Sequence, residues 1–159
     1  MLTANGKAIC KITNGISRPN YTYLIPDEGD VQIFFNSGGN VQYFNELLAG
    51  MHIVVGSGNT APASSDKAME SEVTDLTVIS TTGTNDNGNA SYEQDYIAIF
   101  SRTYRNDTES DVVISEVGIQ HYGHASNTSP LANFLLARDV ISPVTIKPGE
   151  AYTFTMYIG

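Results

Sequence analysis

The sequence predicts an all-β fold, an antiparallel β-sandwich of the jelly-roll or Ig-like type with at most one short helix. Charged residues make up only 16% of the 159 residues, and Thr, Ser, Asn and Gly take their place, which favours strands and tight turns. Short runs of β-branched and aromatic residues recur between turn signals at the spacing of a sandwich. No long helical patterns alternate with these runs, which argues against a parallel α/β sheet. The length suits a single domain, residues 1–159.

Period-two alternation and β-branched or aromatic composition place the individual strands. In chain order we expect strands at 6–13, 31–35, 51–55, 72–80, 95–104, 112–122, 133–141, 143–147 and 151–158. Alternation in the 112–122 run places Val113, Val117 and Ile119 at positions that can face a core. In the last run, one apolar face is expected from Tyr152, Phe154, Met156 and Ile158.

The connections carry turn chemistry. Runs 95–104 and 112–122 flank the polar stretch 105–110 and predict a hairpin, and 143–147 and 151–158 flank Pro148-Gly149 and predict a second. Only Val41–Ala49 has helical spacing, and 82–90 is expected to be an exposed loop. We expect residues 1–50 to deviate most from the sandwich, as a possible attachment or subunit-swapped segment.

Charge and cysteine content exclude several classes of protein. The net charge is −9, and the eight basic residues form no cluster, which argues against binding nucleic acid or an anionic membrane. Cys10 is the single cysteine, so no internal disulfide is expected and a small buried hydrophobe is the simplest reading. The start of the sequence lacks signal-peptide features and no apolar run has the length of a membrane span, so synthesis in a cytoplasm is expected.

Catalytic motifs fail on their spacing. Gly56-Ser57-Gly58 is one residue short of the Gly-x-Ser-x-Gly nucleophile motif, and it lacks the third glycine and the helix of a dinucleotide fingerprint. We interpret this stretch as a turn that lets the chain leave the 51–55 strand. No catalytic or cofactor-binding residue is assigned, and the protein is not expected to be an enzyme.

Metal-binding patterns fail in a similar way. His121 and His124 are three apart, so a regular strand would point them to opposite faces, and His52 is distant in sequence. Histidines at a surface or an interface are the expected outcome. The stretch 85–88 faintly resembles a calcium loop, but Gly83 and Gln94 would then occupy its first and last ligand positions. A solvated turn is expected there, although a loosely bound cation stays open, and no metal ligand is assigned.

Glu116 is the acidic residue in an otherwise apolar strand, 112–119. If its side chain faces inward it needs a partner, and Arg138, in the 133–141 run, is the candidate. We favour a structural ion pair, or a Glu116 that faces water, over a catalytic acid.

Several motifs occur in a particular order along the last two-thirds of the chain. They are Met51–Pro62 with its Gly-x-Gly-x-Thr turn, Ser65–Met69, Asn106, Ile114–Ile119, Leu135–Arg138 and Val144–Glu150. As an ordered set they resemble a segment of tailed-bacteriophage virion structural proteins, with Met69 where Leu is usual. The resemblance begins at about residue 51 and leaves residues 1–50 uncovered.

The resemblance implies a non-enzymatic virion protein, a capsid decoration or head-fibre component that acts through protein–protein contacts. Its partners would be the major capsid protein or neighbouring head or tail proteins and further copies of itself, without a cofactor. It would assemble in the cytoplasm of the host bacterium and reside in the virion. Two alternatives stay open, a tail-associated adaptor and a module that binds host-surface glycans. The glycan module would use exposed aromatic side chains, for which the candidates are Tyr92, Tyr104, Tyr122 and the 83–91 loop.

Overall fold

The computed structural model describes residues 1–3, 6, 22–24, 33–35, 51–80, 89–91, 98–124 and 131–158. Its named elements are all strands, so the all-β prediction is confirmed. In chain order they are β1 (Thr22–Leu24), β2 (Ile33–Phe35), β3 (Met51–Gly56), β4 (Thr77–Ser80), β5 (Asn89–Ser91), β6 (Ala98–Arg105), β7 (Val112–His124), β8 (Leu131–Ile146) and β9 (Ala151–Ile158). Across these described residues, no helix has the length and apolarity that crossing a membrane would require.

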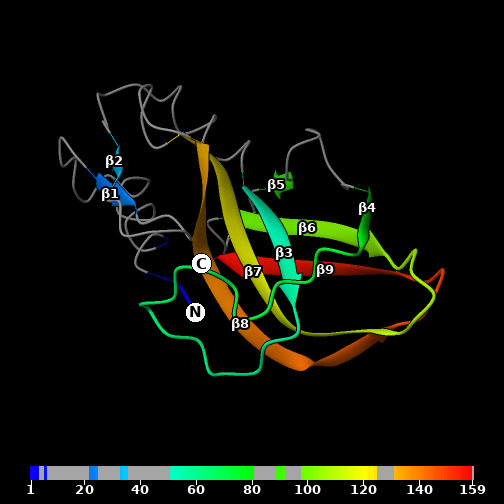
Figure 1. Cartoon of the computed structure of the whole chain (residues 1–159). Coiled ribbons are helices and arrows are strands. Elements are labelled where there is room, and N and C mark those ends of the chain that lie inside the picture. Colours follow the sequence, from blue (N-terminus) through cyan, green and yellow to red (C-terminus); the bar gives the residue numbers. More distant parts are fainter. Residues whose placement is uncertain are drawn as a thin grey trace.

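Two antiparallel sheets make up the sandwich. In the first, β7 lies between β3 and β8. In the second, β6 is central, with β9 along its whole length, whereas β4 and β5 pair with opposite ends of β6. Figure 1 shows the first sheet crossing in front of β6 and β9. The short strands β1 and β2 pair with each other.

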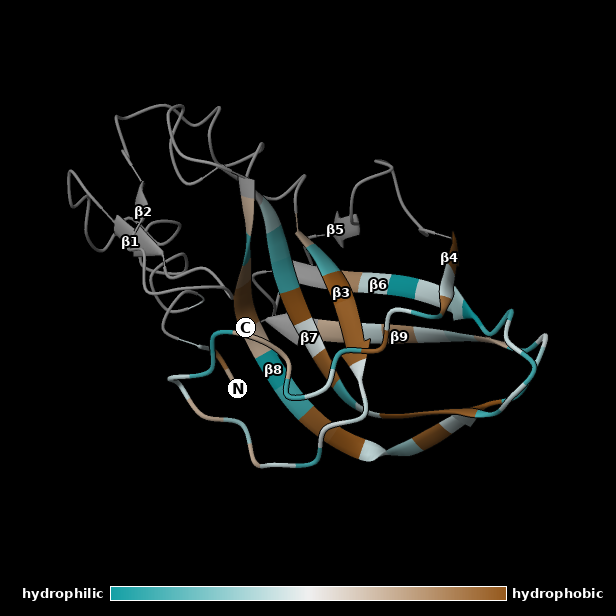
Figure 2. Cartoon of the chain, in the orientation of Figure 1, coloured by the Kyte–Doolittle hydropathy of each residue, from teal (hydrophilic) through white to brown (hydrophobic). Residues whose placement is uncertain are grey.

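The hydrophobic core lies between the two sheets. Alternating side chains of β3, β7 and β8 supply one wall, and side chains of β6 and β9 supply the other. Its largest members are Ile53, Phe100, Tyr104, Ile114, Ile119, Phe134, Leu136, Ile146 and Phe154. Figure 2 shows the apolar residues concentrated on β3, β7 and β8, the strands that cross the second sheet.

A β-bulge between β7 and β8 changes which residues face this core. The register shifts between Ile114 and Glu116, so Ile114 and Val117 both pack inside although they are three residues apart. Val113, which strict alternation placed at a core-facing position, is 45% exposed. That prediction was wrong, whereas Val117 and Ile119 are buried as expected.

Both predicted hairpins were wrong. β6 pairs with β4, β5 and β9, while β7 pairs with β3 and β8, so residues 106–111 carry the chain from one sheet to the other. The Pro148-Gly149 turn does the same between β8 and β9, and Gly149 adopts the left-handed backbone conformation expected of it, with φ 80°. The strands that flank these two connections lie close to where the sequence placed them, but each connection crosses between the sheets.

The buried Asn106 ties these two crossings together. Its side-chain amide donates to the carbonyls of Ser110 and Ile146, at 2.7 and 2.8 Å. Its backbone N–H donates to Glu150 O, and its carbonyl accepts from the N–H of Gly149. One side chain therefore satisfies groups in both connections at this end of the sandwich.

Three further differences concern element boundaries. The runs 133–141 and 143–147 form one continuous strand, β8, because a bulge opposite Ser115 accommodates Pro143. The 72–80 run is a strand only from Thr77, and Glu72 forms an isolated bridge with Gly56. The strand expected at 31–35 is present as β2, Ile33–Phe35. Cys10, the helix expected at 41–49 and almost all of the strand expected at 6–13 lie outside the described residues.

Candidate functional site

The segment 57–76 covers the outer face of the β3-β7-β8 sheet. Met69, from this segment, packs with Val54 and Leu135 in a small second core on that face. Gly118 lies beneath it, and a Cβ there would stand 2.6 Å from the Met69 sulfur. The absence of side chains at Gly118 and Gly56 lets the covering segment approach the sheet closely.

The Glu116 carboxylate sits between the sheet and the covering segment, with an exposed fraction of 0%. Its Oε1 accepts N–H groups of Ser71, at 2.8 Å, and Gly58, at 3.3 Å. Its Oε2 accepts the N–H of Glu70, at 3.3 Å, and the Nε–H of Arg138, at 2.6 Å. Three backbone amides of the segment therefore converge on one buried carboxylate, which satisfies its charge.

Arg138, on the neighbouring strand β8, binds the same segment from its other side. Its Nη1 donates to Asp66 Oδ2 at 2.9 Å, and its Nη2 donates to Glu70 Oε2 and to the carbonyl of Thr60, both at 3.1 Å. Arg138 is 3% exposed, so its charge is compensated by these carboxylates and not by bulk water. The Glu116–Arg138 ion pair predicted from the sequence is confirmed.

Glu70 anchors the turn at the outer rim of this network. Its carboxylate accepts the hydroxyl and N–H of Thr60, both at 2.7 Å, and the N–H of Asn59 at 2.8 Å. The Thr60 hydrogen bonds hold the pKa of Glu70 below its ordinary value, with a smaller contribution from the Arg138 charge. Burial acts to lower the pKa of Arg138, but the hydrogen bonds to Glu116 and Asp66 outweigh it and the pKa is raised.

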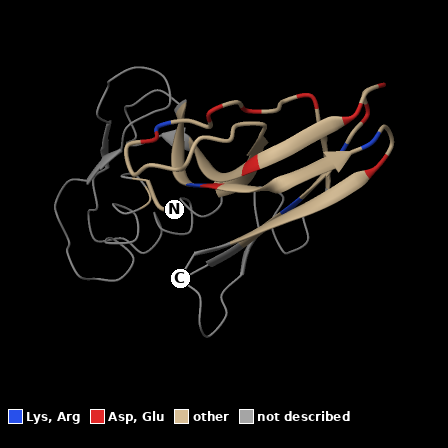
Figure 3. Cartoon of the chain, turned by 90° about the horizontal axis from the view of Figure 1, so that it is seen from below, with Lys and Arg blue, Asp and Glu red and all other residues tan. Residues whose placement is uncertain are grey.

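This arrangement is a clasp and we call it the Glu116–Arg138 clasp, formed by Thr60, Asp66, Glu70, Glu116 and Arg138. Figure 3 shows the acidic positions along the covering segment. A catalytic acid must reach a substrate, whereas the Glu116 carboxylate is enclosed and fully engaged in hydrogen bonds. The role of the clasp is to hold the irregular segment 57–76, 20 residues long, on the sheet.

The other residues considered from the sequence do not gather at this clasp. β3 ends at Gly56, so the chain leaves the strand at Gly56-Ser57-Gly58 as expected, but residues 57–59 do not form the expected turn. His121 is buried and stacks on Phe134, with ring centroids 6.2 Å apart, so it is a core side chain and the surface expectation was wrong for it. The side chain of His124 and residues 82–88 lie outside what the structure describes.

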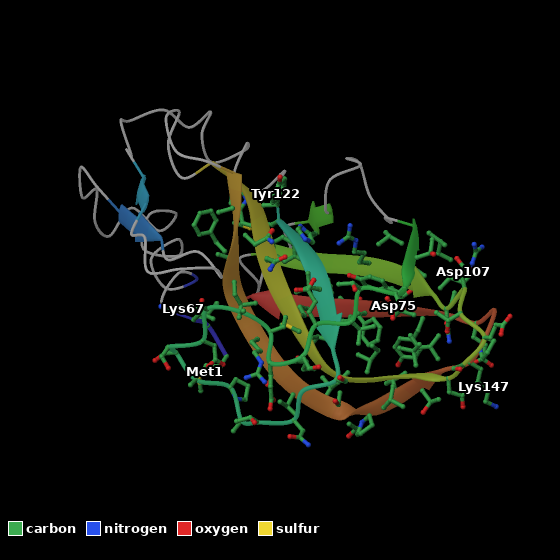
Figure 4. The ribbon with its side chains drawn as sticks, viewed as in Figure 1. Met1, Lys67, Asp75, Asp107, Tyr122 and Lys147 are labelled. Carbon is green, nitrogen blue, oxygen red and sulfur yellow. The ribbon has the colours of Figure 1, made fainter. Side chains whose placement is uncertain are left out.

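The candidate glycan-binding tyrosines differ in how much of each side chain is exposed. Tyr104 is 5% exposed, and its hydroxyl donates to the carbonyl of Ile53 at 2.5 Å, so it offers no ring to a ligand. Tyr122 is 52% exposed near one end of β7, away from Asp107 and Lys147 at the opposite tip of the sandwich (Figure 4). Tyr92 is outside the described residues.

Sequence reasoning missed Asp66, Glu70 and the bridging role of Asn106. Asp66 and Glu70 lie in an irregular segment, where no periodicity indicates which way a side chain points. The available signal was the buried Arg138 itself, because a guanidinium with five N–H donors needs more than one acceptor. Within the part of the chain that the structure describes, no group of three or more His, Cys, Asp or Glu side chains is placed to hold a metal ion.

Comparisons of this chain with models of known protein families, with curated proteins and with solved structures found no match in any of the three.

Proposed function

We propose that the protein is a non-enzymatic virion structural protein of a bacteriophage, a capsid decoration or head-fibre component that acts by binding neighbouring subunits. The observation that carries the proposal is what the phage-like motifs do in three dimensions. These motifs are scattered from residue 51 to residue 150 in the sequence, and residues from them meet in two networks of the fold. Motifs that serve the framework fit a building block better than an enzyme.

The first network is the Glu116–Arg138 clasp. Residues from four of the resembling motifs form this clasp or lie against it: Gly56, Gly58, Thr60, Asp66, Met69, Glu116, Gly118 and Arg138. The second is the junction of Asn106 with the Pro148-Gly149-Glu150 turn. Residues of the ordered motifs therefore hold the covering segment on the sheet and tie the two inter-sheet connections together.

The outer face of β6 and β9 fits a role in wet, polar contacts. Across this strand pair, Thr103 and Thr153 form a hydroxyl–hydroxyl hydrogen bond of 2.7 Å, and Ser101 and Thr155 form one of 2.9 Å. Such uncharged hydroxyl ladders stiffen a sheet and leave lone pairs for water or a neighbouring chain. Surfaces of this kind suit the wet contacts between subunits of a symmetric particle.

A sedimentation assay tests the proposal. Heads of the phage that encodes the protein, prepared without it, are mixed with increasing amounts of the purified full-length chain and pelleted. We expect saturable co-sedimentation with a fixed number of copies per capsomer, and electron cryo-microscopy should show the added density. Heads of an unrelated phage are the control. A chain that stays monomeric and remains in the supernatant with its own heads would contradict the proposal.

The exposed Tyr122 favours a second candidate, a module that binds host-surface glycan. Tyr122 lies directly opposite Asn133 in the β7–β8 ladder, so an exposed ring and an amide are neighbours on adjacent strands. Glycan-array binding that disappears in Tyr122→Ala and persists in Tyr152→Ala, a second exposed tyrosine, would support this candidate. Binding unaffected by Tyr122→Ala would remove it.

A further inference from the structure

Residues 1–3 extend the β3-β7-β8 sheet by pairing with the outer edge of β8. The backbone nitrogen of Met1 donates to Arg138 O at 2.6 Å, and the N–H of Arg138 donates back to Met1 O at 3.0 Å. The N–H of Thr3 donates to Leu136 O at 3.0 Å, and Leu2 and Ala137 form an antiparallel bridge between these two positions. The segment is therefore a short added strand.

Side chains make this pairing specific. Leu2 packs against the main core cluster, and Thr3, 1% exposed, places its hydroxyl 2.7 Å from Leu135 O and 3.0 Å from Leu136 O. The N–H of Gly6 donates to this hydroxyl at 3.2 Å. A Cβ at Gly6 would collide with the backbone of Leu136. The edge of β8 therefore contacts three specific features of this segment: the apolar side chain of Leu2, the buried hydroxyl of Thr3 and Gly6.

Directly after Arg138, the backbone groups on the outer edge of β8 are no longer free to pair with another strand. Asp139 Oδ1 accepts the N–H of Val140 at 3.1 Å, which occupies the next amide of the strand. Pro143, farther along, has no N–H to offer. Exposed strand edges are commonly blunted by such acidic and proline residues, because an open edge pairs with any passing strand. The blocked part of the edge therefore begins directly after Arg138, the last residue that the Met1–Thr3 segment contacts.

The added strand reaches its site from far away in the sequence. Its hydrogen bonds join residues 132 to 137 positions apart, and residues 4–50 separate it from β3. Exchange of an identical element between copies is a low-cost route to assembly, because the contacts made are the same whichever copy supplies the segment.

We propose that the Leu135–Arg138 edge of β8 is a strand-acceptor site and that, in the assembled protein, the Met1–Thr3 segment of a second copy fills it. The exchange joins subunits without requiring any new interface chemistry. This inference rests on the self-association included in the proposed function. It does not depend on which face of a virus particle the protein binds.

Disulfide trapping in trans tests the exchange. In full-length chains that carry Cys10→Ser, one copy receives Leu2→Cys and a differently tagged copy receives Ala137→Cys. Leu2 and Ala137 are bridge partners, and the Cα atoms of such antiparallel partners are about 4.5 to 5.5 Å apart, within the range for a disulfide. After the copies are co-expressed and oxidised, we expect a disulfide-linked heterodimer whose yield is about tenfold that of a control pair. The control pair combines Leu2→Cys with Thr145→Cys, an exposed position on β8 beyond Pro143.

The double variant Leu2→Cys with Ala137→Cys in one chain distinguishes the outcomes. If this chain forms only an internal disulfide while the mixed single variants stay unlinked, the segment binds in cis and the exchange is overturned. If neither forms a disulfide, the acceptor site itself is overturned. In both cases sedimentation velocity and head binding still report on the proposed function, because those measurements do not require strand exchange.

Discussion

The guanidinium Nε of Arg138 lies 2.6 Å from Oε2 of Glu116, and both residues are buried on adjacent strands under an irregular segment. Arg138 also pairs with Met1 through its backbone, so one residue holds both the covering segment and the added strand. A buried charge that satisfies several elements at once has a large effect when it is removed, because each former partner is left unpaired.

Replacing Arg138 by methionine tests this relationship. Arg138→Met leaves the Glu116 carboxylate buried without its cation, and we expect the free energy of unfolding to fall by about 3–5 kcal/mol. Urea denaturation at neutral pH measures the change. The control is Arg105→Met, because the Arg105–Asp107 pair has side chains 45% and 42% exposed and should contribute little to stability. Equal losses in the two variants would contradict a buried role for the clasp.

Asn106→Ala should weaken the junction between the two inter-sheet connections and so lower the free energy of unfolding. The substitution removes the donors to Ser110 O and Ile146 O and the acceptor for Thr108. Because these groups are left without a partner, we expect a loss of about 2–4 kcal/mol, and each kcal/mol lowers the melting temperature by about 2–4 °C. Asn59→Ala is the matched control, since the Asn59 side chain is exposed and only its backbone binds Glu70. A melting temperature equal to that of the control would count against the junction.

Local patterns in the sequence predict the strands but not their partners. The polar stretch after Arg105 and the Pro148-Gly149 turn carry the chemistry of tight turns, and that chemistry is the same whether the next strand pairs with the last one or crosses to another sheet. The choice depends on long-range contacts, here the bonds of the Asn106 side chain to Ile146 and of its backbone to the second turn. Neither has a signature in a window of a few residues.

The Glu116–Arg138 pair of the clasp was predictable, because it follows from the cost of burying a charge and does not depend on the periodicity of the sequence. A carboxylate in an apolar strand requires a cation, which identified Arg138 as the partner of Glu116. The remaining partners, Asp66 and Glu70, lie in an irregular segment without alternation. The bulge at Ser115 escaped prediction for a related reason: it inverts the facing of Val113 and depends on the register with β8.

Substitution of Gly56 and substitution of Gly149 should lower the free energy of unfolding for different reasons. A Cβ at Gly56 would lie 2.5 Å from the Ser71 carbonyl oxygen and would press on Glu116, so Gly56→Ala and Gly56→Asn should both cost about 1–3 kcal/mol or more. Gly149 has open space around it but a positive φ of 80°, so Gly149→Ala should cost about 1–2 kcal/mol. Gly149→Asn should cost less, because asparagine tolerates the left-handed conformation. Thermal denaturation of the four variants compares alanine with asparagine at each of the two positions. Tolerance of alanine at Gly56 would mean that segment 57–76 is not held against β3.

Acid should weaken the clasp at Glu70. The Thr60 hydrogen bonds hold its pKa in the folded protein below the value of 4.5 that it has when unfolded. The contribution of Glu70 to stability is therefore present above that unfolded value and is lost as the pH falls through the lower, folded value. In Glu70→Gln this titration is absent, so we expect the stability difference between wild type and variant to shrink when urea denaturation is moved from about pH 7 to about pH 3. Glu109→Gln, at an exposed position, is the control for the general effect of acid. A difference between wild type and Glu70→Gln that stays constant across this range would show that the Glu70 carboxylate does not anchor the turn through its charge.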